Sequence, residues 1–353
     1  MVGRQAKAQA LRELCKTKVL LKDGPYGTMI QNHGLDEAGY RGSAFQDVNK
    51  DQKGNNDLLN LSRPDIIRGI AQAYVEAGAD VLATNTFNAN AISQSDYGTE
   101  AYTAEINRAA GRILREVVDE ANEVNPEKPR FVVGAIGPTN KTLSVSPDVE
   151  NPGHREVSFD DMKAIYREQV DALLEGGVDF ILIETIFDTL NAKAALMAVA
   201  EAGDALGEEI PVMVSLTITD MAGRNLSGQT PEAFWYSVRH VSPLTVGLNC
   251  SFGARELRPH LAAMSKLADT LIMAYPNAGL PNDLGAYDES PDETAELVSE
   301  WLSDNLVNII GGCCGTTPEH IRALHDVVNG QTPRLPAHLA PSMRLSGLEA
   351  VTL

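Results

Sequence analysis

The chain has 353 residues, 43% of them hydrophobic, which suffices for one large α/β domain with a sizeable core. Lys and Arg number 29 against 48 Asp and Glu, a formal net charge of −19, so we expect neither nucleic-acid nor membrane binding. No apolar run approaches the roughly 20 residues that span a bilayer. The N-terminal segment also lacks the uninterrupted apolar stretch of a signal peptide. The sequence therefore predicts a cytoplasmic protein.

Short apolar, β-branched runs alternate along the chain with amphipathic segments of helical period. Their continuous apolar character is typical of strands buried on both faces. Eight such strand–helix units predict a single-domain (β/α)8 TIM barrel over residues 1–330. An open doubly wound sheet is the alternative, but the first run is followed by GPYG at 24–27 rather than by a G-x-G-x-x-G turn. The expected strands are 19–23, 81–85, 131–136, 180–184, 212–216, 245–249, 271–274 and 307–310.

The helix before the second strand has recognisable ends. Apolar residues from Ile66 to Val75 share one helical face. Ser62 and Asp65 predict a capping box at its start, and Gly78 predicts its stop. A similar helical pattern over 162–174 precedes the fourth strand.

Two segments lie outside the regular repeat. Residues 24–62 form a long connection after the first strand, where a barrel loop commonly builds an active site or lid; a tolerated surface insertion is the alternative. Residues 331–353 contain Pro333, Pro336 and Pro341 and show no strong periodicity. They predict an extended tail or linker that wraps the barrel.

Three of the four cysteines follow predicted strands. Cys250 follows the sixth in TVGLNC, and Cys313 and Cys314 follow the eighth in IIGGCCGTTP. Both loops open on the same face of a barrel, so the three thiols are expected to converge. Three thiolates with one open position is the arrangement of a catalytic zinc, although spacing alone also allows a redox pair or plain packing. Cys15 lies in an N-terminal helical pattern and is interpreted as a small buried hydrophobe.

A zinc held by three cysteines predicts thiol chemistry. An incoming thiol is the natural fourth ligand, and zinc would hold it as the thiolate at neutral pH. The expected reaction is attack of that thiolate on an electrophilic carbon, with alkyl transfer to sulfur. Asp23 and Glu184 end the first and fourth strands. Either could pair with a substrate ammonium group, or simply accept a hydrogen bond from a loop amide.

The motifs GLNC at 247–250 and GGCCGTTP at 311–318 resemble the zinc signature of homocysteine S-methyltransferases, which are (β/α)8 barrels. The resemblance covers essentially the whole chain. Within the family it is greatest to the N-terminal homocysteine-binding domain of cobalamin-dependent methionine synthases. It implies a methyltransferase of the 5-methyltetrahydrofolate–homocysteine type, which forms methionine. The further segments that carry it are KGNNDLLNLSRPD (53–65), ATNTFNAN (83–90), GPTNKTLSVSPDVENP (137–152), ETIFDTLNAKAA (184–195), TDMAGRNLSGQTPEAF (219–234), YPNAGLPN (275–282) and RLSGLE (344–349).

The resemblance also implies roles for single residues. Cys250, Cys313 and Cys314 would be the catalytic zinc ligands, and the homocysteine sulfur would complete the set. Asn277 would be a weak fourth ligand when homocysteine is absent. The residues implied to contact homocysteine are Asp23 and Glu184, near its amino group, together with Gly24, Thr28 and Asn249.

One departure and one absent motif bear on this comparison. The first loop reads DGPYGT at 23–28, where the family more often has a small residue followed by Met or Phe. The sequence also contains no D-x-H-x-x-G segment of the kind that holds the corrinoid in methionine synthases. Methylcobalamin would then be supplied by another domain or chain, with corrinoid-binding and folate-binding domains or subunits as partners. The alternatives are a small donor, betaine or S-methylmethionine, and a non-catalytic module that binds zinc and homocysteine.

Overall fold

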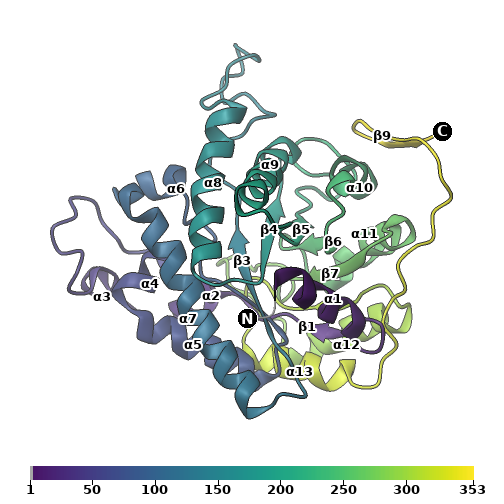
Figure 1. Ribbon diagram of the computed structural model, residues 1–353, viewed down its shortest axis with the longest axis horizontal. Helices are drawn as coiled ribbons and strands as arrows, with labels where there is room; N and C mark the ends of the chain where they lie inside the picture. The colour runs from purple at the N-terminus through teal and green to yellow at the C-terminus, as the bar shows by residue number, and fades with distance from the viewer. Residues whose placement is uncertain (1–2) are drawn as a thin grey trace.

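The computed structural model describes residues 3–353. Eight parallel strands form one sheet in the order β1-β8-β7-β6-β5-β4-β3-β2, and a parallel bridge between Lys22 and Val81 closes the ring. The fold is the predicted (β/α)8 barrel (Figure 1). Its strands are β1 (Leu20–Leu21), β2 (Val81–Ala83), β3 (Phe131–Ile136), β4 (Phe180–Ile186), β5 (Val212–Leu216), β6 (Thr245–Asn249), β7 (Leu271–Tyr275) and β8 (Ile309–Ile310).

Helices surround the barrel (Figure 1); α1 precedes β1, α13 follows β8, and the others lie in the connections between strands. The helices are α1 (Arg4–Leu14), α2 (Tyr26–Gln31), α3 (Glu37–Arg41), α4 (Leu59–Ser62), α5 (Pro64–Ala77), α6 (Ala91–Ser95), α7 (Thr103–Val124), α8 (Phe159–Glu175), α9 (Thr189–Leu206), α10 (Pro231–Val238), α11 (Ala254–Leu267), α12 (Pro291–Ser303) and α13 (Pro318–Val328), with 3-10 turns η1 (Asn56–Leu58), η2 (Glu100–Tyr102) and η3 (Arg239–Val241).

The strands are buried on both faces, as their continuous apolar runs predict. Leu20 belongs to the interior core of the barrel, whereas the adjacent Leu21 belongs to the larger core between strands and helices. Phe131 and Phe180 stack in the interior core with centroids 5.7 Å apart. Helix α1 adds Cys15 to this interior core, so the interpretation of Cys15 as a buried hydrophobe is confirmed.

The predicted capping box at the start of α5 is wrong. Arg63 occupies the N-cap position and Pro64 the first helical turn. The carboxylate of Asp65 accepts two hydrogen bonds from the Arg63 guanidinium, at 2.7 and 2.9 Å. The Ser62 hydroxyl donates to the Leu58 carbonyl. The predicted stop is confirmed, because Gly78 ends α5 with φ +112°.

Residues 24–62 contain regular structure rather than one irregular loop. Helices α2, α3 and α4 and the turn η1 all lie in this segment. The Tyr40 hydroxyl donates to Asn56 Oδ1 at 2.9 Å and ties α3 to η1. Hydrophobic periodicity does not reveal such elements, because each has six residues or fewer.

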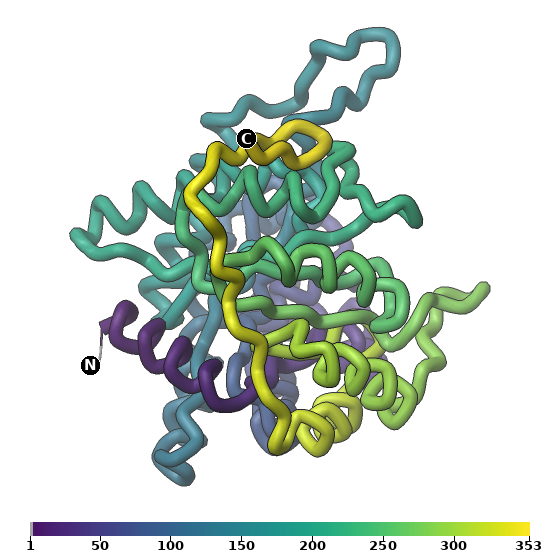
Figure 2. The backbone as a smooth tube through the Cα atoms, turned by 90° about the vertical axis from the view of Figure 1, so that its right-hand side faces the viewer, coloured from purple at the N-terminus to yellow at the C-terminus, as the bar shows by residue number. Residues whose placement is uncertain are grey.

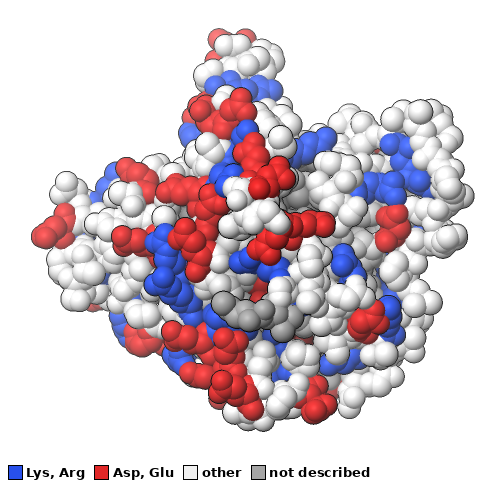
Figure 3. Space-filling model, in the orientation of Figure 1, with Lys and Arg blue, Asp and Glu red and all other residues white. Residues whose placement is uncertain are grey.

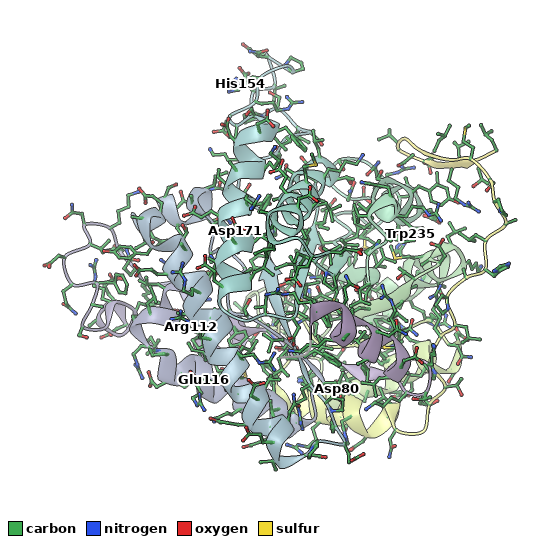
Figure 4. The ribbon with its side chains drawn as sticks, in the orientation of Figure 1. Asp80, Arg112, Glu116, His154, Asp171 and Trp235 are labelled. Atoms are coloured by element: carbon green, nitrogen blue, oxygen red, sulfur yellow. The ribbon has the colours of Figure 1, made fainter. Side chains whose placement is uncertain are left out.

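The segment after α13 follows the outside of the barrel (Figure 2). It ends in an antiparallel pair, β9 (Arg344–Ser346) and β10 (Ala350–Thr352), which the sequence did not predict. The Ser346 and Ser237 hydroxyls lie 2.7 Å apart, which attaches the pair to α10, the helix that carries Trp235 (Figure 4). The buried Arg334 guanidinium anchors the segment near its start by donating to the Thr270 carbonyl at 2.8 Å.

Acidic side chains are spread over the face shown in Figure 3, with Lys and Arg among them. Arg68 of α5, for example, pairs with Glu116 and Glu120 of α7. Within residues 3–353, no helix combines the length and the apolar character needed to span a bilayer.

The closeness of strand packing gives a test of the barrel. A Cβ at Gly247 of β6 would overlap the carbonyl oxygen of Met273 in β7, whereas a Cβ at Gly69, on the exposed side of α5, would meet nothing within 4 Å. We expect Gly247→Ala to lower the free energy of unfolding by at least about 3 kcal/mol. The control Gly69→Ala should raise it by about 0.5 to 1 kcal/mol. Urea unfolding measures both, and equal effects would contradict the packing described.

Candidate metal centre and substrate pocket

Strands β6 and β8 bring three cysteines to one end of the barrel. Cys250 directly follows β6, and Cys313 and Cys314 follow β8 after two glycines. Their sulfur atoms all lie within 4.8 Å of one another, and the Cys250 and Cys314 Sγ atoms are 3.8 Å apart. Loops that are distant in sequence therefore present three soft ligands to one point.

The backbone around these cysteines is held in unusual conformations. Cys250 and Ser251 both have left-handed dihedrals, with φ of +63° and +60°, which non-glycine residues adopt only when the surroundings fix them. Cys250 N–H donates to the Tyr275 carbonyl at 3.4 Å, and Cys313 N–H donates to the Pro276 carbonyl at 2.8 Å. The loops after β6 and β8 are thus both tied to the end of β7.

The sulfur geometry suits a tetrahedral metal. Metal–sulfur distances near 2.3 Å place the sulfurs of a tetrahedral zinc site about 3.8 Å apart. The separation of Cys250 and Cys314 has this value. Asn277 lies next to the group, because Pro276 and Ala278 on either side of it hydrogen-bond to the cysteine backbone. Among the described residues, the buried Asn277 Oδ1 has no hydrogen-bond partner, as a weak fourth ligand would require.

The neighbouring thiols favour the thiolate form of Cys314. Hydrogen bonds from Cys250 and Cys313 stabilise a thiolate on Cys314 and lower the pKa of that thiol. Below them, Asn249 Nδ2 lies 3.9 Å from the Cys313 sulfur and 2.9 Å from Thr185 Oγ1. Asn249 is buried, so this structure places the residue implied as a substrate contact in support of Cys313.

Charged side chains lie on the floor of the barrel beneath the cysteines. The ammonium group of Lys22 forms a buried 2.8 Å ion pair with Asp23 Oδ1 and lies 4.6 Å from the centroid of the Tyr275 ring. The Tyr275 hydroxyl donates to Glu184 Oε2 at 2.8 Å. Burial opposes the charged form of Lys22, but the neighbouring negative charges of Asp23 and Glu184 outweigh it and raise its pKa.

The two carboxylates proposed to meet a substrate ammonium differ in access. Asp23 is fully buried, and its Oδ2 accepts a hydrogen bond from the Ala83 amide at 2.8 Å. Glu184 borders the cavity that opens beside the cysteines. The amide that Asp23 accepts belongs to strand β2 and not to a loop, and Glu184 is the one of the two carboxylates that borders the cavity.

A cavity of about 520 Å³ adjoins the three cysteines. Its volume lies within the range of small-molecule sites. Gly24 and Thr28 both border it, and Thr28 Oγ1 accepts a hydrogen bond from the Gly315 amide at 3.1 Å. Only glycine fits at 24, because a Cβ there would lie 2.6 to 2.9 Å from the Tyr74 ring and hydroxyl. The first loop is thus fastened to the cysteine loop of β8.

Residues 20–328 match the model of the family described as homocysteine S-methyltransferase. The chain belongs to the homocysteine S-methyltransferase family. Among solved structures, it is similar to the metallated form of the homocysteine methyltransferase MmuM from Escherichia coli, with 22% identity, a TM-score of 0.67, and coverage of 89% of this chain and 98% of that one. The oxidized form of MmuM gives a TM-score of 0.66 at 22% identity, with coverage of 87% and 95%. The structural likeness shows the shared barrel, and membership of the family supports methyltransferase activity.

Four further residues of this cavity were not predicted from the sequence. Lys22 and Tyr275 form its floor together with Glu184, Asp57 lies in the wall from η1, and the Tyr287 ring packs against Gly315 beside the cysteines. Lys22 had a visible signal, because it is a charged residue that directly continues the apolar run VLL. The others had none, since a tyrosine in a strand or loop and an acidic residue in a polar stretch are ordinary.

The metal assignment can be tested by substitution. We expect alanine at any of Cys250, Cys313 or Cys314 to abolish retention of zinc, because two sulfurs hold it much more weakly than three. Cys15→Ala, in the core, should keep about one zinc per chain. Elemental analysis after gel filtration measures the content, and circular dichroism checks the fold. Full metal content in all three substituted proteins would exclude these ligands.

Asp57 gives a pH-dependent test of the cavity wall. Its side chain is buried and accepts from the Asn88 amide at 2.9 Å, and burial raises its pKa to about 7. Between about pH 4 and pH 7 the unfolded chain therefore loses a proton that the folded chain keeps, so Asp57 lowers stability as pH rises. Relative to wild type, Asp57→Asn should gain about 1 kcal/mol of stability per pH unit in this window.

Urea unfolding at pH 5 and pH 7 measures that gain. Substitution of the exposed Asp51 by Asn is the matched control and should show no such trend. Parallel stability profiles for wild type and Asp57→Asn would mean that Asp57 ionises in the folded protein as it does in water.

Proposed function

We propose that this chain is a zinc-dependent homocysteine S-methyltransferase that forms methionine with a methyl group from methylcobalamin, supplied by another domain or chain. The observation that carries the proposal is the group of three cysteine sulfurs beside a cavity with charged groups on its floor. A thiol that also carries charged groups suits such a cavity. Homocysteine has all of these features.

Each residue of the site has a proposed task. Zinc held by Cys250, Cys313 and Cys314 would lower the pKa of the homocysteine thiol and keep it as the thiolate at neutral pH. Glu184 would accept the substrate ammonium. Thr28 holds the cysteine loop through the Gly315 amide, and Asn249 steadies the Cys313 sulfur. The homocysteine sulfur would accept the methyl group of the donor, whose cobalt–carbon bond would break with its electron pair left on cobalt.

Two of the segments that resemble methionine synthases lie at the end of the barrel that carries the cysteines. Residues 53–65 contribute Asn56 and Asp57 to the cavity wall. Residues 137–152 leave the carboxyl end of β3 in a long connection that projects beyond the start of α8 (Figure 1) and carries His154 at its tip (Figure 4). These positions support a partner that brings the corrinoid to this face. The folate-binding partner, the division at residue 330 and the cytoplasmic location stay predictions.

The donor is tested with the zinc-loaded chain, homocysteine and one methyl donor at a time. We expect methionine, measured by mass spectrometry, from free methylcobalamin but not from betaine or S-methylmethionine. Cys314→Ala should reduce the rate to that of the uncatalysed reaction, because the metal site is lost. Methionine from only a small donor would overturn the corrinoid assignment. Tight homocysteine binding with no turnover from any donor would indicate a binding module.

A further inference from the structure

Each of the three cysteine sulfurs accepts a hydrogen bond from a group outside the cysteine side chains. The donors are the Asn249 side chain, the Tyr287 hydroxyl and the Ser251 amide. We propose that these donors direct methylation to the substrate, because they make the protein's own sulfurs less nucleophilic than the homocysteine sulfur. The proposal rests on the proposed function in taking homocysteine as the fourth ligand. It makes Asn249 and Tyr287 positioning residues of the site.

A metal centre of this composition has to distinguish between similar sulfurs. With homocysteine bound, four thiolates would surround the zinc, and a methyl donor could react with any of them. A methylated cysteine is a neutral thioether, which no longer supplies the thiolate that zinc requires. Contacts that make the protein sulfurs less reactive than the substrate sulfur therefore preserve the metal site.

Asn249 is oriented so that its amide nitrogen faces Cys313. Its Oδ1 accepts the Ser215 hydroxyl at 2.6 Å and the Thr185 amide at 3.1 Å, so these two donors fix which end of the side chain carries the nitrogen. Nδ2 then lies 2.9 Å from Thr185 Oγ1 and 3.9 Å from the Cys313 sulfur. Asn249 is 1% exposed, so water does not replace this donor.

Tyr287 supplies a hydroxyl to Cys314 from the connection between β7 and α12. The hydroxyl donates to the Cys314 sulfur. The ring packs so closely on the next residue that a Cβ at Gly315 would lie 2.3 Å from Tyr287 Cβ. Asn282 Oδ1 accepts the Ala286 amide at 3.0 Å and so holds the residues just before Tyr287. The ring is therefore positioned both by the cysteine loop and by its own connection.

Cys250 accepts its hydrogen bond from the backbone. The donor is the amide of Ser251, the next residue in the chain. Both residues have positive φ, +63° and +60°, in the region that glycine adopts more readily. Each of the three donors is thus occupied by a protein sulfur. A substrate sulfur that enters from the cavity is left without these bonds.

A hydrogen bond to a thiolate lowers its reactivity toward carbon. The donor withdraws electron density from the sulfur, and the nucleophilicity of a thiolate falls as its basicity falls. Hydrogen bonds from residues around a metal site tune its ligands in this way. Three donors placed on the three protein sulfurs therefore leave the substrate sulfur as the most nucleophilic of the four.

Methyl iodide tests this role without homocysteine or a corrinoid. A cysteine thiolate attacks the methyl carbon, the sulfur–carbon bond forms, and the carbon–iodine bond breaks with its electron pair leaving as iodide. Tandem mass spectrometry gives the initial methylation rate of each cysteine in the zinc-loaded chain. We expect Tyr287→Phe to raise the rate at Cys314 about three- to tenfold and to change Cys313 by less than about twofold, because only one donor is lost.

Asn249→Ala should give the complementary pattern, with the rate raised at Cys313 and not at Cys314. Tyr236→Phe is the matched control, because its hydroxyl lies 2.9 Å from Thr352 Oγ1 on the outer side of α10. All three cysteine rates should then equal those of wild type. The half-buried Tyr287 lies in a loop, so Tyr287→Phe is expected to fold even if Asn249→Ala does not.

Two results would overturn the proposal. One is an unchanged rate at Cys314 in Tyr287→Phe that retains its zinc. The other is an equal rise at all three cysteines, which would show that the substitution only opens the site. Neither result bears on the proposed function, which the assay with methylcobalamin and homocysteine tests separately. A wild-type chain that holds no zinc would overturn both.

Discussion

Closure of eight parallel strands into one ring is the constraint on which the site depends. All strands of such a ring end at the same face, so residues far apart in sequence become neighbours there. Cys250 comes from β6 and Cys313 and Cys314 from β8, yet they meet because β7 alone lies between these strands. The Cys250 and Cys313 amides both bond to the end of β7, so the strand order also sets how far apart the sulfurs lie. Metal-binding geometry is here a consequence of strand order.

Closure of the strand ring also fixes the positions of the charged side chains Lys22 and Asp23. An isolated bridge between Lys22 and Val81 joins the first strand to the second, and it fixes Lys22 and Asp23 at this junction of the ring. Asp23 then bonds to the Ala83 amide of β2 and draws the Lys22 ammonium toward the same wall. An ion pair sealed in this way gains little stability over a well-packed apolar pair, because desolvation offsets the attraction.

The sequence was informative wherever a residue's role follows from its position along a strand. All eight strands were predicted in order, with differences of a few residues at their ends, because continuous apolar runs identify them. The three cysteines converge as predicted because all of them follow strand ends. The short helices of residues 24–62 and the hairpin of 344–352 were missed, since both are too short for periodicity to show. The capping box failed because Arg63, adjacent in sequence, competes for Asp65.

The roles of Asp23 and Glu184 show where such reasoning stops. Both end predicted strands, and nothing in a strand-end position distinguishes a carboxylate that faces a cavity from one that is sealed behind a neighbour. The difference comes from Lys22, whose ammonium forms an ion pair with Asp23. Of these two carboxylates, Glu184 is the one that borders the cavity. With zinc on three thiolates the metal site carries net −1, and the homocysteine thiolate would make it −2. A buried ammonium near that charge offsets part of it, whereas a second open carboxylate would add to it. Of the two carboxylates that end the first and fourth strands, only Glu184 thus borders the cavity, beside the zinc ligands.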